Sequence, residues 1–296
     1  DNFLKFAAYS ICDRALPTVE DGLKPVQRRI LHAMWEKDDG RFSKVAGVVG
    51  NTMHYHPHGD AAIKDAIVTL ANKRYLIEGQ GNFGNILTGD EAAAGRYIEC
   101  RLTKLAREQL FSPKITDYVP SYDGRNKEPV LLPAKVPLCL MLGVDGIAVG
   151  LSTAVLPHNF IELLQAEIEI LKGHPCPVLV PDFITGGEMD ASDYDDGRGS
   201  VKVRARIEER KGERNKLFVT SVPYGVTTDR LAESIEKAIK SKRLPIKHID
   251  NFTAESVEIE LTLAPGSDAD KVRKSLYAFT DCERRIPSRI VVLSQN

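Results

Sequence analysis

The spacing of apolar residues changes along the chain from a helical period to a two-residue alternation. In KPVQRRILHAM, residues 24–34, apolar side chains recur every three or four positions, as on one face of a helix. From Gly199 the segment SVKVRARIEE alternates apolar and polar residues, as in a strand with one buried face. Helical segments followed by such strands predict an α+β protein.

The first 110 residues are predicted to form three helices and a hairpin. One helix begins at Pro25, a second is capped by Ser43 and a third by Asp60. RYLIEGQGNFGNILTGDEAAAGRYIECRL then indicates strand, loop and strand, and a helix capped by Thr103 follows. This order predicts a winged helix, a variant of the helix-turn-helix whose second helix can enter a DNA major groove.

The second half is predicted to be a separate α+β unit. A helix starts at Asn159, and after Gly199 the pattern gives two strands, a helix from Thr228, two strands, a helix and a final strand, SRIVVL. This order is typical of a split βαβ, or ferredoxin-like, unit. We expect two domains, at residues 1–118 and 119–296.

Composition and charge narrow the possible classes of function. The chain is 43% hydrophobic and carries 40 basic and 41 acidic residues, a net charge of −1, so any DNA binding must rely on individually placed cations. The five cysteines are scattered without CxxC spacing, which argues against a disulfide framework and a zinc knuckle. No run approaches the length of a membrane-spanning helix, and we expect a soluble cytoplasmic protein.

The segment HYHPHGD, residues 54–60, contains three histidines and has three possible interpretations. Imidazole is a common metal ligand, but the proline between His56 and His58 and the lack of a matching carboxylate or cysteine cluster argue against a metal site. Gly59 and Asp60 open a helix, whose free N–H groups favour anions, so the turn can hold a phosphate. The third interpretation is an ordinary polar turn with a helix cap.

Two glycine-rich or acidic segments resemble known ligand motifs only by their letters. GQGNFG, residues 79–84, matches the dinucleotide pattern GxGxxG, but the required helix after the third glycine and the βαβ context are missing. MDASDYDDG, residues 189–197, lacks the spacing and terminal glutamate of a calcium loop. We interpret both segments as turns.

AAAGRYIECRL places Arg96 next to Tyr97. A tyrosine hydroxyl has a pKa near 10 and needs nearby cations, and a base or metal, to act as a nucleophile. Arg14, Lys24, Arg96 and the two turn histidines, His56 and His58, are candidate cations. In a regular strand Arg96 and Tyr97 would point to opposite faces, so both reach one phosphate only if the segment is looped or bulged.

Five motifs, in this order and spacing, resemble the breakage-reunion subunit of bacterial type IIA topoisomerases, the A subunits of gyrase and topoisomerase IV. They are RALPTVEDGLKPVQRRIL, YHPHGDAA, EGQGNFG, AGRYIECRL and GIAVGLSTAVLPHN. PVQRR favours the topoisomerase IV form slightly. The resemblance implies a winged-helix DNA-gate domain over residues 1–118 and a tower domain over residues 119–296. The coiled coil and carboxy-terminal domain would lie beyond Asn296, so we expect an excised fragment.

The resemblance also implies roles for individual residues. Tyr97 matches the tyrosine that attacks a DNA phosphodiester and forms a 5′-phosphotyrosyl link, and Arg96 matches the arginine that stabilises charge on the phosphate. Val155 matches an apolar wedge that inserts between base pairs. Further positions expected to bind DNA are Arg14, Lys24, Arg28, Arg29, His56 and His58.

Two departures from the family pattern concern ligands. Gln27 stands where gyrase has a histidine. Ala61 stands where the family often has the serine that anchors quinolone drugs through a metal-bound water, whereas the acidic partner position is kept as Asp65. We therefore expect weak quinolone action; potent drug-stabilised cleavage that is unaltered in Ala61→Ser would contradict this expectation.

The implied partners are double-stranded DNA, a second copy of this chain and a B subunit in an A₂B₂ assembly. The sequence contains no GxxxxGK[ST] loop and no evident carboxylate cluster, and in the family Mg²⁺ and ATP are bound by the B subunit. The expected enzyme is an ATP-dependent type II topoisomerase that acts in chromosome segregation on nucleoid DNA. A non-catalytic winged-helix DNA-binding protein and a histidine-cluster metallohydrolase remain alternatives.

Overall fold

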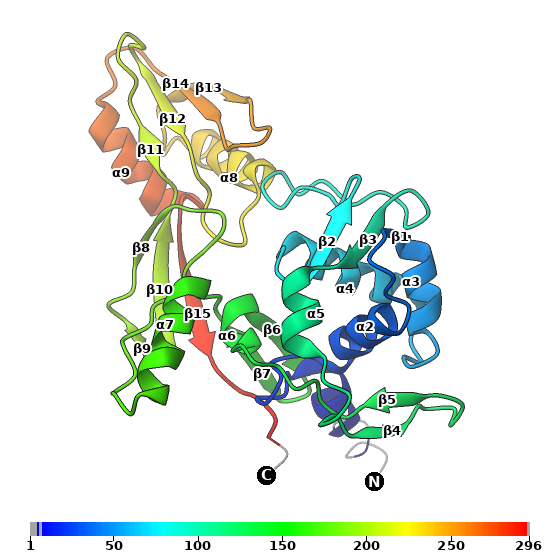
Figure 1. The fold of residues 1–296 in the computed structure, drawn as a ribbon. Coiled ribbons are helices and arrows are strands. Elements are labelled where there is room, and N and C mark those ends of the chain that lie inside the picture. The colour runs from blue at the N-terminus through cyan, green and yellow to red at the C-terminus, as the bar shows by residue number, and fades with distance from the viewer. Residues whose placement is uncertain (1–4, 6–7, 295–296) are drawn as a thin grey trace. The chain divides into compact units, whose positions relative to one another are not determined.

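A computed structural model describes residue 5 and residues 8–294, and it divides the chain into two compact units (Figure 1). Unit 1 comprises residues 1–84, 91–179 and 289–296, and unit 2 comprises residues 85–90 and 180–288. The mixed helix and sheet content confirms the predicted α+β class. The boundary predicted between residues 118 and 119 lies inside unit 1, so the compact units are divided elsewhere.

Unit 1 begins with helices and a small sheet. A short π-helix η1 (Ile11–Ala15) precedes α2 (Pro25–Glu36), α3 (Val45–Thr52) and α4 (Asp60–Asn72). The sheet contains β1 (Ser43–Lys44), β2 (Ile77–Gln80) and β3 (Glu99–Leu102) in the antiparallel order β1-β3-β2, and α5 (Lys104–Leu110) follows. The residues directly after Gly84 are not helical, so GQGNFG is not followed by the helix that the dinucleotide motif requires.

The buried stripes of these helices agree largely with the helical period. Ile30, Ile63 and Ile67 are fully buried in one core with residues of α3 and the sheet. One detail of the α3 prediction is wrong. Ser43 does not cap the helix, because it pairs with Cys100 in the sheet and Lys44 is the N-cap.

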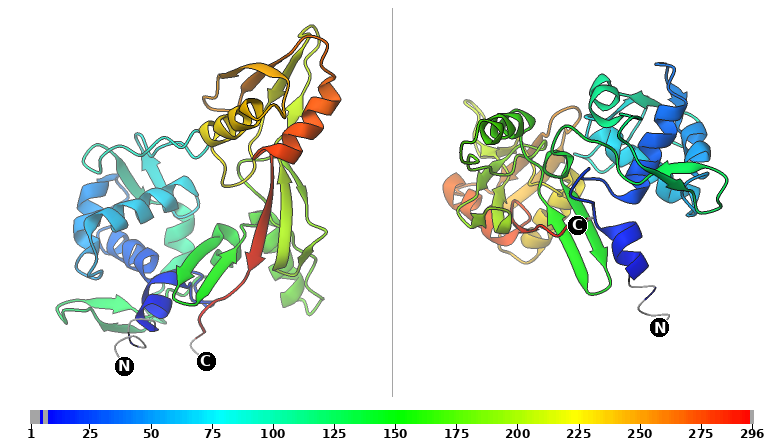
Figure 2. Two further views of the ribbon diagram at one scale, coloured as in Figure 1. Left: turned by 180° about the vertical axis from the view of Figure 1, so that it is seen from behind. Right: turned by 60° about the horizontal axis from the view of Figure 1, so that its bottom comes forward.

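The remainder of unit 1 consists of two hairpins and two helices. The first hairpin joins β4 (Tyr118–Pro120) and β5 (Lys127–Pro129), and α6 (Leu138–Leu142) follows. The second joins β6 (Val144–Ala148) and β7 (Leu151–Val155), which lie side by side in the right-hand view of Figure 2. Asn159 caps α7 (Phe160–Leu171) as predicted, because its side chain accepts from the Ile161 and Glu162 amides.

Unit 2 contains most of the remaining strands and has its own core. In one sheet β10 (Arg198–Arg204) lies between β8 (Glu188–Asp190) and β15 (Glu283–Arg289), and β9 (Tyr194–Asp195) also pairs with β10. The other sheet has the order β11-β12-β14-β13. These strands span Ile207–Glu208, Lys216–Val219, Ile259–Leu263 and Ile246–Asn251, respectively.

Two helices share the core of unit 2. They are α8 (Thr228–Lys240), capped by Thr227, and α9 (Ala269–Phe279), capped by Asp268. The last strand was predicted at residues 288–293, but β15 ends at Arg289. None of the helices within residues 8–294 is long and apolar enough to cross a membrane.

Candidate DNA-cleavage site

The histidine-rich turn connects α3 to α4. Gly59, in an extended conformation, is the N-cap of α4, and Asp60 is the first helical residue. At this position the positive end of the helix dipole stabilises the Asp60 carboxylate. The Tyr55 hydroxyl bonds the Glu36 carboxylate of α2, which anchors the turn, and burial and this carboxylate raise the pKa of Tyr55. Within the described residues, no group of three His, Cys, Asp or Glu side chains is placed to hold a metal ion.

His56 and His58 contact each other and neighbouring side chains, whereas His54 is exposed. The His56 and His58 rings meet edge to face with centroids 4.7 Å apart. Arg29 Nη1 lies 3.1 Å from His56 Nδ1, and the Tyr9 hydroxyl hydrogen-bonds His58 Nε2. The turn is therefore tied both to α2 and to the segment before η1.

The electrostatic environment keeps His56 neutral. Its pKa is lowered to about 4, first by burial, then by the positive charge of Arg29, the neighbouring His58 ring and the positive charge of Arg14. Burial disfavours the charged imidazole, and each neighbouring cation adds to that cost. At neutral pH His56 therefore offers one N–H donor and one nitrogen acceptor.

Arg14 is exposed on η1, close enough to His56 for its charge to act on that ring. The end of η1 packs on β6, where a Cβ at Gly146 would collide with the Ala15 carbonyl oxygen. Glycine at this position allows the Arg14 segment to approach the β6–β7 hairpin.

Lys24 and Lys73 both bind main-chain oxygens at the base of the β6–β7 hairpin. Lys24 Nζ donates to the Asp145 carbonyl at 2.5 Å, and burial lowers the Lys24 pKa. Lys73 Nζ donates to the carbonyls of Leu142 and Gly143 at 2.6 and 2.8 Å, and burial lowers its pKa to about 8. The sequence analysis missed Lys73, since a lysine at the end of a helix gives no signal of such contacts.

Arg96 and Tyr97 lie together in a turn, as the sequence analysis required for both to reach one phosphate. The turn is closed by the Tyr97 amide, which donates to the Ala94 carbonyl at 2.9 Å, and β3 begins only at Glu99. Tyr97 is 64% exposed, and Arg96 Cζ lies 4.5 Å from the centroid of its ring. Among the described residues, no hydrogen bond or ring contact joins this pair to the histidines.

Arg28 does not have the geometry expected of a DNA contact. It is 8% exposed, and its guanidinium donates to both carboxylate oxygens of Asp21, at 2.6 and 2.9 Å, and to the Thr18 hydroxyl at 2.9 Å. Because these donors are used inside unit 1, the structure gives Arg28 an internal ion pair, and we leave it out of the proposed DNA contacts. Its role in the structure is to hold the loop between η1 and α2 against α2.

Val155, the position expected to act as an apolar wedge, is buried in this structure. It is 2% exposed at the end of β7, where it pairs with Val144. Ile147, on β6 of the same hairpin, pairs with Ser152 and is 89% exposed.

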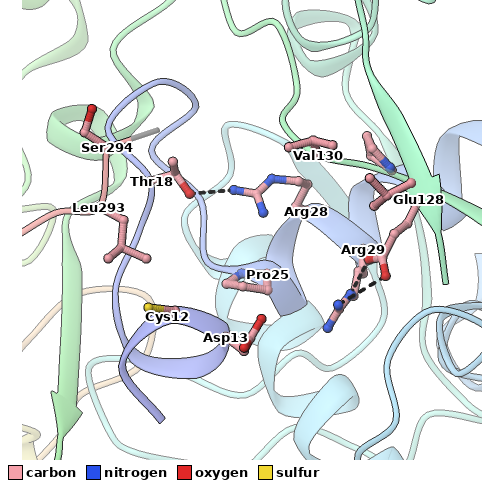
Figure 3. Close-up of a pocket in the computed structure, with 12 residues that line it drawn as sticks. Cys12, Asp13, Thr18, Pro25, Arg28, Arg29, Glu128, Val130, Leu293 and Ser294 are labelled. Atoms are coloured by element: carbon pink, nitrogen blue, oxygen red, sulfur yellow. Dashed lines mark hydrogen bonds and ion pairs between the residues drawn. The ribbon is translucent and has the colours of Figure 1, made fainter. Parts of the chain in front are cut away.

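A pocket of about 410 Å³ lies beside the histidine turn, and its lining includes Arg28, Arg29 and Glu128 (Figure 3). Arg29 and Glu128 form a bidentate ion pair there. The two positions assigned to drug binding, Ala61 and Asp65, are both exposed on α4. The contacts of the turn join His56 to Arg29 and His58, and Arg14 is close enough for its charge to act on His56.

Known proteins match this chain over most of its length. The family described as the A subunit of DNA gyrase/topoisomerase IV matches residues 14–296. The A subunit of DNA topoisomerase 4 from Borreliella burgdorferi is 51% identical over 295 residues, which cover all of this chain and 47% of that protein. The same protein of Rickettsia conorii is 39% identical over 326 residues and is covered to 44%.

The A subunit of DNA gyrase from Staphylococcus aureus is 36% identical over 320 residues, which cover 99% of this chain and 36% of that protein. The chain therefore spans less than half the length of each of these relatives. Because the family match extends over far more than half of the sequence, the chain belongs to the family of DNA gyrase and topoisomerase IV A subunits.

Proposed function

We propose that this chain is the DNA breakage-reunion part of an ATP-dependent type II topoisomerase. The observation that carries the proposal is the exposed Tyr97 with the Arg96 guanidinium on its ring, at the positions that match the family motif. The Tyr97 oxygen attacks a DNA phosphorus, the bond to the 3′ oxygen breaks, and a 5′-phosphotyrosyl link and a free 3′-hydroxyl result. Attack by that hydroxyl reseals the strand.

The fold supports this role in its arrangement of helices and sheet. In the proposal, α2 to α4 with the β1-β3-β2 sheet form a winged-helix DNA gate, and α4 is the helix that enters the groove. The functional domains are assigned to residues 1–118 and 119–296. In the proposed tower, the sheet β11-β12-β14-β13 together with α8 and α9 forms the split βαβ unit. Strands β12, β14 and β13 supply three of its four strands, and β11 supplies the fourth.

The proposed DNA contacts are Arg14, Lys24, His56 and His58, with Val155 as the apolar wedge and the exposed Ile147 of the same hairpin as a second apolar contact. Arg14 is exposed and the His56 ring is neutral, so the first supplies charge and the second a hydrogen bond to phosphate oxygens. Ile147 is 89% exposed on β6, where it pairs with Ser152, so its side chain is available to the bases.

Mg²⁺ and ATP are assigned to a partner B subunit. The described residues of this chain provide no cluster suited to a metal ion, so no step of the proposed reaction is assigned to a metal bound here. The proposed assembly contains two A and two B subunits and acts on nucleoid DNA in the cytoplasm. The exposed Ala61 and Asp65 are the proposed drug-contact positions on α4.

Topoisomerase IV is favoured over gyrase as the type of enzyme. The identity to the topoisomerase 4 protein of Borreliella burgdorferi is 51%, against 36% to the gyrase protein of Staphylococcus aureus. We therefore assign mainly DNA unlinking to the holoenzyme, with gyrase-type supercoiling as the alternative.

Replacement of Tyr97 by Phe tests the proposed chemistry. In the full-length A protein with B subunit, Mg²⁺, ATP and supercoiled DNA, Tyr97→Phe should abolish covalent cleavage and leave DNA affinity within about threefold, because only the nucleophilic oxygen is lost. Tyr122→Phe is the matched control, since Tyr122 is 58% exposed in the same unit. Cleavage that survives Tyr97→Phe would show that this tyrosine is not the nucleophile, and a wild type that binds DNA without cleaving it would favour the non-catalytic DNA-binding protein.

A further inference from the structure

Glu128, in the middle of β5, is the starting point of a contact chain that ends on His56. We propose that Glu128 is a positioning residue for DNA cleavage, which acts by fixing Arg29 so that Arg29 sets the tautomer and orientation of the His56 ring. This inference rests on the proposed function, because it assigns a role to a residue that does not itself touch DNA.

The first link is the bidentate pair between Glu128 and Arg29. Arg29 Nε donates to Oε2 at 2.5 Å and Nη2 donates to Oε1 at 3.2 Å, as the dashed lines in Figure 3 show. Glu128 is 8% exposed, so water competes little for its carboxylate. Two parallel bonds fix the plane of the guanidinium as well as its position, which a single ammonium contact would not do.

The second link determines where the proton of His56 resides. Arg29 Nη1 lies 3.1 Å from His56 Nδ1, and a guanidinium nitrogen can only donate. Nδ1 must therefore be the acceptor, and the single proton of the neutral ring must sit on Nε2. The lowered pKa of His56 agrees with this neutral form.

The arrangement changes the role expected for Arg29. Three of its N–H groups are directed to Glu128 and His56, so its charge is largely compensated within unit 1. Arg29 then acts on DNA through His56 rather than as a direct phosphate ligand. The ring is left with Nε2–H as its donor, a directed hydrogen bond for a phosphate oxygen without a full positive charge.

The sequence offers a matched control for the ion pair itself. Arg101 and Glu78 form a bidentate pair of the same kind in unit 1, with Nε to Oε2 at 2.8 Å and Nη2 to Oε1 at 3.2 Å, but no histidine among the described residues accepts from Arg101. Glu78→Gln therefore removes a bidentate ion pair that is more exposed than the Arg29–Glu128 pair and has no link to a ring. Glu128→Asp keeps the charge but withdraws the carboxylate by one methylene group.

The test combines a spectroscopic measurement with cleavage. Ring ¹⁵N shifts of His56, assigned by comparison with His56→Gln, should show Nδ1 unprotonated and Nε2 protonated near neutral pH in the wild-type 296-residue chain. Glu128→Gln should give mixed tautomers. In the full-length A protein with B subunit, the same variant should lower the cleavage rate about ten- to a hundredfold with DNA affinity nearly unchanged, because a reacting geometry is disturbed.

Each result bears on one of the two proposals. The positioning role is supported by three results together. Glu128→Gln gives mixed His56 tautomers and slow cleavage, Glu128→Asp has an intermediate effect on both, and Glu78→Gln changes neither. An unchanged tautomer in either Glu128 variant, or mixed tautomers with unchanged cleavage, overturns it even when the wild type cleaves DNA. A wild type with the expected tautomer that forms no covalent DNA complex overturns the proposed function instead, and the positioning role falls with it.

Discussion

Arg28 and Arg29 are adjacent on α2 and have different environments. The helical period turns Arg28 toward Asp21 in the interior and Arg29 toward Glu128 and His56. Both side chains are basic and both precede an apolar stripe, so the sequence alone suggested the same DNA-binding role for each. The difference becomes visible only through carboxylates that lie elsewhere in the chain.

The first prediction contrasts Arg28 with Arg14. Arg28→Met should lower the free energy of unfolding by about 3–5 kcal/mol, because it leaves the buried Asp21 carboxylate without its ion-pair partner. Arg14→Ala should leave the free energy of unfolding nearly unchanged. It should reduce the slope of the logarithm of the DNA-binding constant against the logarithm of the salt concentration by the amount that corresponds to about one phosphate contact. Urea unfolding and binding titrations at several salt concentrations measure these effects.

Asp21→Asn in the Arg28→Met background is the control, and it should restore part of the lost stability. A stable Arg28→Met protein with weakened DNA binding would contradict the structural role given to Arg28.

The second prediction concerns the pH dependence of stability. The pKa of His56 is lowered from 6.5 to about 4 in the folded chain. Between these values the unfolded chain takes up a proton that the folded chain refuses, so the free energy of unfolding should fall by about 1–3 kcal/mol as pH drops through this window. Above pH 6.5 both states are neutral at this residue, and the effect should vanish.

Denaturant unfolding between about pH 7 and 4 provides the measurement. His56→Gln should flatten the pH dependence relative to wild type, whereas the exposed His54→Gln should retain it. Equal slopes in wild type and His56→Gln would argue against the lowered pKa.

At the scale of elements, local signals identified most helices and strands. Pro25 begins α2, Asn159 caps α7, and Val201, Val203, Ala205 and Ile207 are buried as their alternation predicted. The strand itself is broken after Arg204, and β10 and β11 lie in different sheets. The errors occurred where a long-range contact overrides a local preference. Ser43 is a good cap by residue type but pairs with Cys100 of β3.

The third prediction tests one local signal. Thr103 caps α5 by accepting from the Ala106 amide at 3.1 Å, and its hydroxyl also donates to the Tyr75 carbonyl at 2.7 Å. Thr103→Ala should therefore cost about 1–2 kcal/mol of stability, near the upper end for a helix cap. Thr103→Ser keeps both bonds and should lose much less in urea unfolding. Equal losses in the two variants would indicate that the methyl group, not the hydroxyl, matters.

At the scale of the whole molecule, the chain contains two separate hydrophobic cores. Unit 1 buries residues of α2 to α6 and β2 to β3, and unit 2 buries residues of α8, α9 and their sheet. The change of apolar periodicity along the sequence led us to expect two domains, but it could not give the boundaries of the compact units. Unit 2 also includes residues 85–90, which are far in sequence from its remaining residues. Similarly, Glu128 is 99 positions from Arg29, and no local pattern links them.

The fourth prediction uses the single tryptophan as a reporter of unit 1. Trp35 stacks on Phe111, with ring centroids 5.1 Å apart and partly buried against the unit 1 core. Ile235→Ala, in the core of unit 2, should lower the unfolding midpoint seen by circular dichroism while the Trp35 fluorescence transition stays in place. Ile67→Ala, in unit 1, should shift the fluorescence transition. Identical shifts by both probes in Ile235→Ala would show that the two cores unfold together.

The distribution of cysteines provides a way to time the opening of each core. Cys100 in unit 1 and Cys282 in unit 2 are fully buried, and burial raises the pKa of each thiol to about 12, so neither reacts until its surroundings open. Cys12 and Cys176 are exposed and can be blocked first. The subsequent alkylation rates of Cys100 and Cys282, resolved by peptide mass spectrometry, then measure how often each core opens under native conditions.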